Sequence, residues 1–150
     1  MAEIFVDEGI DKIMGIFPKN GAGVATLYLG LFTSQTASTV PARGATGGAA
    51  PAGWTEAAGA GYARQSIAAG SWGAPSTNGN GRKITAGEVT FATVGAGVNW
   101  GTANGFFIAT HVSSQAGDTI IYFANFDAGL ARSLVEGVTE KVTPSMQLDG

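Results

Sequence analysis

The segment 89–126 constrains the fold of this chain most strongly, because apolar residues recur in it at every second position. That period is typical of a β-strand, in which successive side chains point to opposite faces. It predicts three strands with their turns. The residues that set the period are Val89 and Phe91, then Phe106, Ile108 and Val112, then Ile121 and Phe123.

The last two of these strands carry apolar residues on their other face as well, namely Phe107, Ala109, Ile120, Tyr122 and Phe126. A strand pair that is apolar on both faces has to be covered on both sides, as the central pair of a β-sandwich is. The connection 113–118 is rich in turn residues and short enough to join neighbouring antiparallel strands. The rest of the chain is expected to supply the cover.

Further strands are predicted at 24–32, 62–68, 133–138 and 140–148. Pro144 is expected to place part of the last one at a sheet edge, because proline cannot donate to a strand ladder. Strands do not alternate with helices along the chain. The predicted fold class is therefore mainly β, an antiparallel β-sandwich or jelly roll of about eight strands with a short N-terminal helix.

The N-terminal helix is predicted at 7–17. Asp7 and Glu8 suit a helix N-terminus, and Pro18 ends the helix. Its apolar face either caps the core of the same domain or docks onto a neighbouring subunit. The residues of this face recur at three- and four-residue spacing and are Ile10, Ile13, Met14 and Phe17.

A chain of 150 residues is predicted to form a single domain, 1–150, with the helical arm at 1–18. A long loop is predicted at 33–61, which consists mostly of Gly, Ala, Ser, Thr and Pro. Such a composition is flexible in isolation. The loop is therefore expected to pack either on its own domain or on a neighbouring chain of an assembly.

Charged residues make up only 13% of the sequence, so small neutral groups are expected to dominate the surface and to favour association. The net charge of −3 and the scattered basic residues argue against a nucleic-acid partner. The absence of cysteine excludes disulfides and thiolate metal sites. No apolar run is long enough for a membrane span and the N-terminus is acidic, so synthesis in a cytoplasm and no membrane partner are expected.

The sequence predicts no catalytic, cofactor-binding or metal-ligating residue, and hence not an enzyme. His111, the only histidine, sits at an alternating position of a predicted strand. A triad with Ser113 or Ser114 and Asp118 is conceivable, but these residues fall within one hairpin and turn chemistry accounts for them. The run 77–81 lacks the acidic ligands of a calcium loop. Three Gly-Ala-Gly triplets lack the third glycine of a dinucleotide-binding motif.

Trp54, Trp72 and Trp100 all lie in glycine-rich segments that are predicted as loops. Each ring either folds back to close an end of the sandwich or contacts a neighbouring chain, where tryptophan is enriched. A sugar-binding role is a third interpretation. Together with the apolar residues of the helix, these tryptophans are the candidate interface residues.

The phrase Gly-Ala-Gly-Tyr-Ala-Arg-Gln at 59–65, after Trp54-Thr55-Glu56, belongs to a wider pattern. The pattern includes the short helix, Leu-Phe-Thr at 31–33, Val-Thr-Phe at 89–91, and Trp100-Gly101 before an apolar strand. In this order the motifs span most of the chain, and the chain resembles a group of small virion structural proteins of tailed bacteriophages. Members of that group are described as tail-fibre-like, minor structural or capsid-decorating proteins.

The resemblance implies a non-enzymatic building block of the virion that is present in many copies, oligomeric and often trimeric. Its partner would be the major capsid protein or another virion protein. The expected function is that of a capsid cement protein, with a tail or tail-fibre component or a host-surface glycan-binding module as alternatives.

The residues of the central phrase also allow an expectation from strand geometry. Tyr62 and Arg64 should share one face of their strand and Gln65 the other. The Arg64 guanidinium is expected to bond carbonyl groups or an acid such as Glu56 within the subunit.

Overall fold

The computed structural model describes residues 3–5, 26–35, 54–74, 76–78, 81–114, 118–126 and 130–148. They form thirteen strands and one short 3-10 helix, η1 (Ala69–Ser71). The first six strands are β1 (Glu3–Phe5), β2 (Thr26–Gln35), β3 (Trp54–Glu56), β4 (Gln65–Ala68), β5 (Ser76–Asn78) and β6 (Gly81–Thr85). The others are β7 (Val89–Thr93), β8 (Asn99–Ala103), β9 (Gly105–Ala109), β10 (Ile120–Asn125), β11 (Arg132–Val135), β12 (Thr139–Val142) and β13 (Ser145–Leu148).

The predicted mainly β fold with antiparallel sheets is confirmed, since every strand pairing among the described residues is antiparallel. The predicted helix at 7–17 lies outside the described residues, and so do its apolar residues Ile10, Ile13, Met14 and Phe17. The predicted loop at 33–61 contains β-structure, because 33–35 complete β2 and 54–56 form β3, which pairs with β2. Residues 36–53 between them are outside the described ranges.

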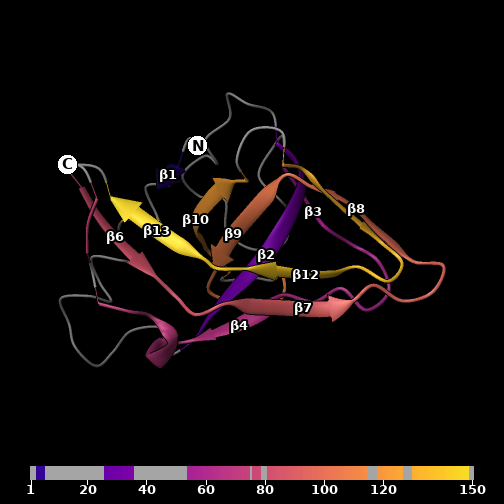
Figure 1. Cartoon of the computed structure of the whole chain (residues 1–150), viewed down its shortest axis with the longest axis horizontal. Coiled ribbons are helices and arrows are strands. Elements are labelled where there is room, and N and C mark those ends of the chain that lie inside the picture. The colour runs from indigo at the N-terminus through magenta and orange to yellow at the C-terminus, as the bar shows by residue number, and fades with distance from the viewer. Residues whose placement is uncertain are drawn as a thin grey trace.

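The C-terminal half is organised as one long two-stranded ribbon. β9 pairs with β10, β8 with β11, β7 with β12, and β6 with β13, so the segments 81–109 and 120–148 run antiparallel along their whole length. Backbone hydrogen bonds continue the ribbon between these pairs, from Ala86 N to Pro144 O (2.9 Å) and from Val94 N to Val138 O (2.9 Å). The connections after β7 and before β12 accordingly lie together at one end of the molecule (Figure 1).

Several predicted strand boundaries are wrong: the strand predicted at 62–68 begins only at Gln65, and the one predicted at 133–138 ends at Val135. The segment 89–126 contains four strands instead of three, because β8 lies between β7 and β9. Its sequence, Asn-Trp-Gly-Thr-Ala, has too few apolar residues to show a strand period. The predicted strand 140–148 is divided into β12 and β13 at Thr143 and Pro144, where the missing proline N–H interrupts the ladder.

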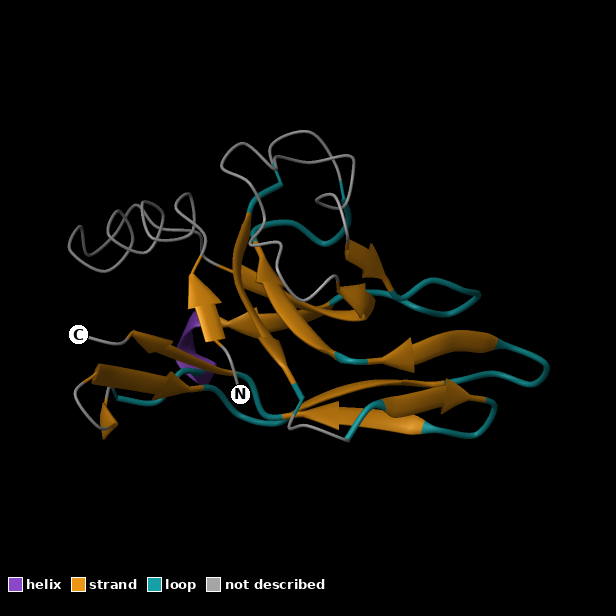
Figure 2. Ribbon diagram, turned by 90° about the horizontal axis from the view of Figure 1, so that it is seen from above, coloured by secondary structure: helices purple, strands orange, loops and turns teal. Residues whose placement is uncertain are grey.

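A six-stranded sheet forms the centre, in the order β1-β10-β9-β2, with β3 and β4 both on the far side of β2 (Figures 1 and 2). All of β9 and residues 121–124 of β10 are buried. This confirms that the strand pair is covered on both faces. Ile121 and Phe123, however, do not share a face, because the ladder shifts register between Ile120 and Tyr122. Ile121 packs in the main core and Phe123 in a second cluster.

The main core joins one face of the six-stranded sheet to the rest of the ribbon. Its members include Leu29, Leu31, Phe106, Ile108 and Tyr122 from the sheet, and Phe91, Leu134, Val142 and Met146 from β7, β11, β12 and β13. The second cluster consists of Phe32, Phe107, Ala109 and Phe123. The central strands β2, β9 and β10 of the six-stranded sheet thus pack on a cluster at each face.

Two glycines allow aromatic rings to cross between β2 and β9. Gly30 lies opposite Phe107, and Phe32 lies opposite Gly105. A Cβ atom at Gly30 would come within 2.2 Å of the Phe107 ring, and one at Gly105 within 2.1 Å of the Ala124 carbonyl oxygen and 2.5 Å of the Phe32 ring. Both positions therefore require glycine.

We expect Gly105→Ala to lower the free energy of unfolding by about 3 kcal/mol, because the new methyl group would collide with backbone as well as with a ring. Gly87→Ala is the matched control, since Gly87 is exposed and has no atom within 4 Å of the added Cβ. Urea unfolding at neutral pH measures both. Equal effects of the two substitutions would contradict the role given to Gly105.

Candidate functional site

Residues 57–64 leave the sheet edge between β3 and β4, which both pair with β2. Opposite this excursion the backbone of Leu31 has no strand partner on that side. Its N–H donates to the Tyr62 hydroxyl (2.9 Å) and its carbonyl accepts from the Ala57 N–H (2.8 Å). The excursion therefore gives the N–H and the carbonyl of Leu31 their hydrogen-bond partners, one from a side chain and one from the backbone.

Trp100 holds the excursion in place. Its indole N–H donates to the Ala60 carbonyl (3.0 Å), and a Cβ atom at Gly59 would come within 2.7 Å of the indole ring. Gly59 and Gly61 both have positive φ, at 147° and 80°, which side-chain-bearing residues rarely adopt. The Tyr62 ring packs edge-on against Trp100 and stacks on Phe91, with centroids 5.5 and 6.2 Å away. The Gly-Ala-Gly-Tyr run thus has a structural explanation at each of its glycines.

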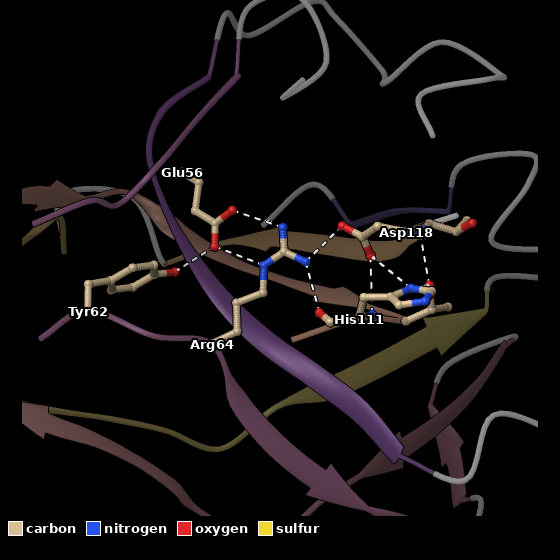
Figure 3. A network of polar contacts seen from close by, with 7 residues as sticks. Glu56, Tyr62, Arg64, His111 and Asp118 are labelled. Carbon is tan, nitrogen blue, oxygen red and sulfur yellow. Dashed lines mark hydrogen bonds and ion pairs between the residues drawn. The ribbon is translucent and has the colours of Figure 1, made fainter. Parts of the chain in front are cut away.

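Arg64 lies at the end of the excursion and is surrounded by acceptors (Figure 3). Its Nε and Nη2 atoms donate to the two oxygens of Glu56, each at 2.9 Å. Its Nη1 donates to Asp118 Oδ2 (2.8 Å) and to the His111 carbonyl (3.0 Å). The Arg64 and Asp118 side chains are only 3% and 4% exposed. The predicted bonding of Arg64 to Glu56 and to a carbonyl is confirmed.

These residues, Glu56, Tyr62, Arg64, His111 and Asp118, are called the Arg64 network below. The guanidinium also lies over the Phe107 ring, 4.9 Å from its centroid, and Phe107 in turn covers Gly30. The contact with Asp118 was not predicted, because 54 residues separate it from Arg64. One feature of the sequence could have indicated this contact. Asp118 is an acid between two apolar strands in a segment with few other charges, so a buried cation is a natural partner for it.

Burial and charge act in opposite directions on this network. Burial disfavours the charged guanidinium, but the hydrogen bonds to Glu56 and Asp118 outweigh it and raise the pKa of Arg64. Burial, aided by the Glu56 carboxylate, raises the pKa of Tyr62, whose hydroxyl donates to Glu56 Oε1 (3.1 Å). One guanidinium faces two carboxylates here, so with its ordinary charges the network carries −1.

Asp118 and Thr110 close the connection between β9 and β10. Asp118 Oδ1 accepts the His111 N–H (3.2 Å), and Thr110 exchanges two hydrogen bonds with Thr119, through its N–H (3.0 Å) and its hydroxyl (2.9 Å). His111 Nδ1 lies 3.0 Å from the Thr110 hydroxyl. His111 is thus in a bend after β9 ends at Ala109, and its predicted position in a strand is wrong. Asp118 is committed to Arg64, which gives it a structural role.

The three tryptophans do not share one environment. Trp100 lies in β8 and Trp54 begins β3, so their predicted placement in loops is wrong. Trp100 is 2% exposed. This favours the interpretation in which its ring folds back onto its own domain, and disfavours the one in which the ring contacts a neighbouring chain. Trp72 is half-buried and forms an isolated bridge with Ala86. For Trp54 the structure describes the backbone pairing with Gln35.

A second arginine binds a buried acid in the ribbon. Arg132 of β11 bonds the Glu140 carboxylate of β12 and lies 4.1 Å above the centroid of the Phe126 ring. In the described part of the chain, no three His, Cys, Asp or Glu side chains are grouped as metal ligands. Nor does that part contain a helix with the length and apolar character of a membrane span.

No protein-family model, no curated protein and no solved structure matches this chain.

We expect Arg64→Met to lower the free energy of unfolding by about 3–5 kcal/mol, because it leaves two carboxylates at least partly buried without their cation. The free energy of unfolding of Arg64→Lys should lie between those of the wild type and Arg64→Met, since an ammonium group cannot bond both partners in the same geometry. Lys141→Met is the control, because Lys141 pairs with Glu88 at 57% and 53% side-chain exposure and should change stability by less than about 1 kcal/mol. Chemical denaturation of the three variants tests the difference. Similar losses for Arg64→Met and Lys141→Met would refute it.

The raised pKa of Tyr62 predicts that the folded protein loses stability at alkaline pH. Because burial raises the pKa of Tyr62 above its ordinary value of 10, the folded protein keeps the phenol protonated where the unfolded chain ionises it. This contribution is fully present below pH 10 and is lost as the pH rises above it. Tyr62→Phe should be less stable than the wild type at pH 8 but should lose less stability between pH 8 and about 11. Urea unfolding measures the free energy of unfolding of both proteins across this pH range. An equal loss in the two proteins would disprove the assignment.

Proposed function

We propose that this protein is a structural component of a bacteriophage virion, a cement protein that lies over junctions between major capsid proteins and stabilises the shell. The observation that carries the proposal is that the motifs of the resemblance that lie within the described residues meet in one set of contacts. Tyr62 contacts Glu56, Phe91 and Trp100, and its hydroxyl bonds the backbone of Leu31. A Cβ atom at Gly101 would lie 3.0 Å from the side chain of Thr33.

This convergence matters because each motif alone is short. Residues 31–33, 54–56, 59–65, 89–91 and 100–101 are widely separated in the sequence, yet their side chains and backbones form one set of contacts. Motifs that depend on one another physically amount to a single structural unit. The resemblance therefore concerns how the chain folds, and it supports membership of a group whose members build virions.

The proposed architecture within the mainly β class is a jelly roll, a form of two-layered antiparallel sandwich. The supporting observation is the nested pairing of β6–β9 with β10–β13, in which eight strands form one long hairpin. Jelly rolls are built from eight strands in two sheets and occur in viral capsid proteins. β2 adds to this plan by pairing with β9.

The surface suits a protein that associates through many modest contacts. Few residues are charged, and Arg64, Asp118 and Glu140 are buried. We propose a homo-oligomer, with a trimer favoured, that binds the major capsid protein or another virion protein after synthesis in the host cytoplasm. Weak contacts repeated over a shell can give a high total affinity. The residues proposed for contacts are Ile10, Ile13, Met14, Phe17, Trp54 and Trp72.

A host-surface glycan-binding module is less well supported. Sugars stack on exposed aromatic faces, but the Trp100 ring is buried and its N–H is bonded to Ala60. A tail or tail-fibre component remains the alternative within the virion.

The test is the copy number of this chain relative to the major shell protein in purified particles, measured by quantitative mass spectrometry. A cement protein should be present at the same order of copies as the shell protein. Particles that lack it should lose heat and osmotic resistance, and addition of the purified protein should restore both. A copy number that is a small fraction of the shell protein's would contradict the cement role and favour the tail.

A further inference from the structure

Asn104 and Gly105 form the join between β8 and β9, and the neighbouring strands hold this join from both sides. The Asn104 N–H donates to the Phe32 carbonyl (2.9 Å), and the Asn104 carbonyl accepts the Phe126 N–H (2.8 Å). The Asn104 side-chain amide donates to the Thr33 carbonyl. Asn104 is therefore bonded at its N–H, its carbonyl and its side chain at once.

Gly105 is buried between the same two neighbours. It lies opposite Phe32 of β2 and Asn125 of β10. A Cβ atom at Gly105 would come within 2.1 Å of the Ala124 carbonyl oxygen. The close approach requires glycine at 105, and the bond to Thr33 uses an asparagine amide. The structural needs of the join therefore place an Asn-Gly sequence at this point of the fold.

Asn-Gly is the dipeptide most prone to spontaneous deamidation, because glycine has no side chain to hinder attack by its backbone nitrogen. The glycine nitrogen forms a bond to Cγ of the asparagine, the Cγ–Nδ2 bond breaks, and ammonia leaves with the proton of the attacking amide. Water then opens the resulting succinimide at either carbonyl and leaves aspartate or isoaspartate. The net change is the uptake of water and the loss of ammonia, without oxidation or reduction.

The folded join opposes this reaction. The attack makes Cγ of Asn104 tetrahedral and draws the side chain toward the Gly105 nitrogen. The amide is held on the Thr33 carbonyl, however, and the Asn104 backbone is bonded to a strand on each side. The reaction therefore requires the join to open first. Its rate in the folded protein should be the rate in the unfolded chain multiplied by the open fraction.

We propose that Asn104–Gly105 is a deamidation site that the fold keeps latent and that reacts only when the join separates from β2 and β10. The product cannot restore the join. A carboxylate in place of the Asn104 amide presents an acceptor to the Thr33 carbonyl, which needs a donor. Isoaspartate adds a backbone atom before Gly105 and displaces β9 relative to both neighbours. Deamidation thus makes the opening of this join irreversible. The inference is independent of the function proposed above.

The first experiment follows deamidation of the full chain at pH 8 and 37 °C, in buffer and in urea at a concentration that unfolds it. Peptide mapping by mass spectrometry measures the modified fraction at each asparagine over time. The Asn-Gly pairs at 20–21, 78–79 and 80–81 in the urea sample give the intrinsic rate. We expect Asn104 to react at that rate in urea and at least about 100-fold more slowly in the folded protein. Equal rates at Asn104 in the two samples, or no reaction in urea, would overturn the proposal.

A second experiment tests the effect of the product on the fold. Asn104→Asp carries one of the two products from the start, and we expect it to unfold at a lower urea concentration than the wild type, or not to fold at all. Asn99→Asp is the matched control. It adds the same charge in the neighbouring strand, but Asn99 is exposed and its Oδ1 accepts the Gly101 N–H (2.7 Å), a bond that a carboxylate keeps. Equal unfolding midpoints for the two variants would refute the irreversibility of the opening.

Discussion

The buried guanidinium of Arg64 connects parts of the chain that no strand pairing joins directly. It is bonded to β3 through Glu56 and to the connection between β9 and β10 through Asp118 and the His111 carbonyl. Buried ion pairs add little net stability compared with apolar packing, because desolvation opposes the attraction. Their effect here is on geometry. Five donors in a rigid plane define where three acceptor groups must lie, and few other conformations satisfy them.

The ribbon begins beside this arrangement. Its four strand pairs follow one another along the chain, starting at β9 and β10, and the register shifts within three of them. β2 can lie beside β9 only because Gly30 and Gly105 admit the rings of Phe107 and Phe32, and Phe107 also supports the guanidinium. Packing at the glycine positions and charge at Arg64 therefore act on the same two strands. Gly30 in β2 and Gly105 in β9 are required because aromatic rings lie against them. One of these rings, that of Phe107, also lies beneath the Arg64 guanidinium.

Alternation predicted the buried pair β9 and β10 correctly, because the apolar side chains of these strands pack on one of two apolar clusters. Arg64 and Glu56 were also paired correctly, since so few charges were available nearby. β8 was missed because Trp100 is its one large apolar residue, and the register shift at Ile121 is invisible in a pattern of consecutive apolar residues. Asp118 was missed for a different reason. Its partner is reached through the tertiary fold, and local patterns carry no information about contacts across 54 residues.

The motifs on which the proposed relation to virion proteins rests are interior groups. Tyr62, Arg64 and Trp100 are bonded within the subunit, so selection on them acts through folding. If the proposed function holds, contacts with other chains use different residues, which are free to change as partners change. A group of proteins could therefore keep this interior while its members occupy different places in a particle. The network and the pair of Arg132 and Glu140 also place several of the few charges in or at the edge of the interior. Exposed charges such as the pair of Lys141 and Glu88 remain, so the surface of the described residues is sparsely charged and not neutral.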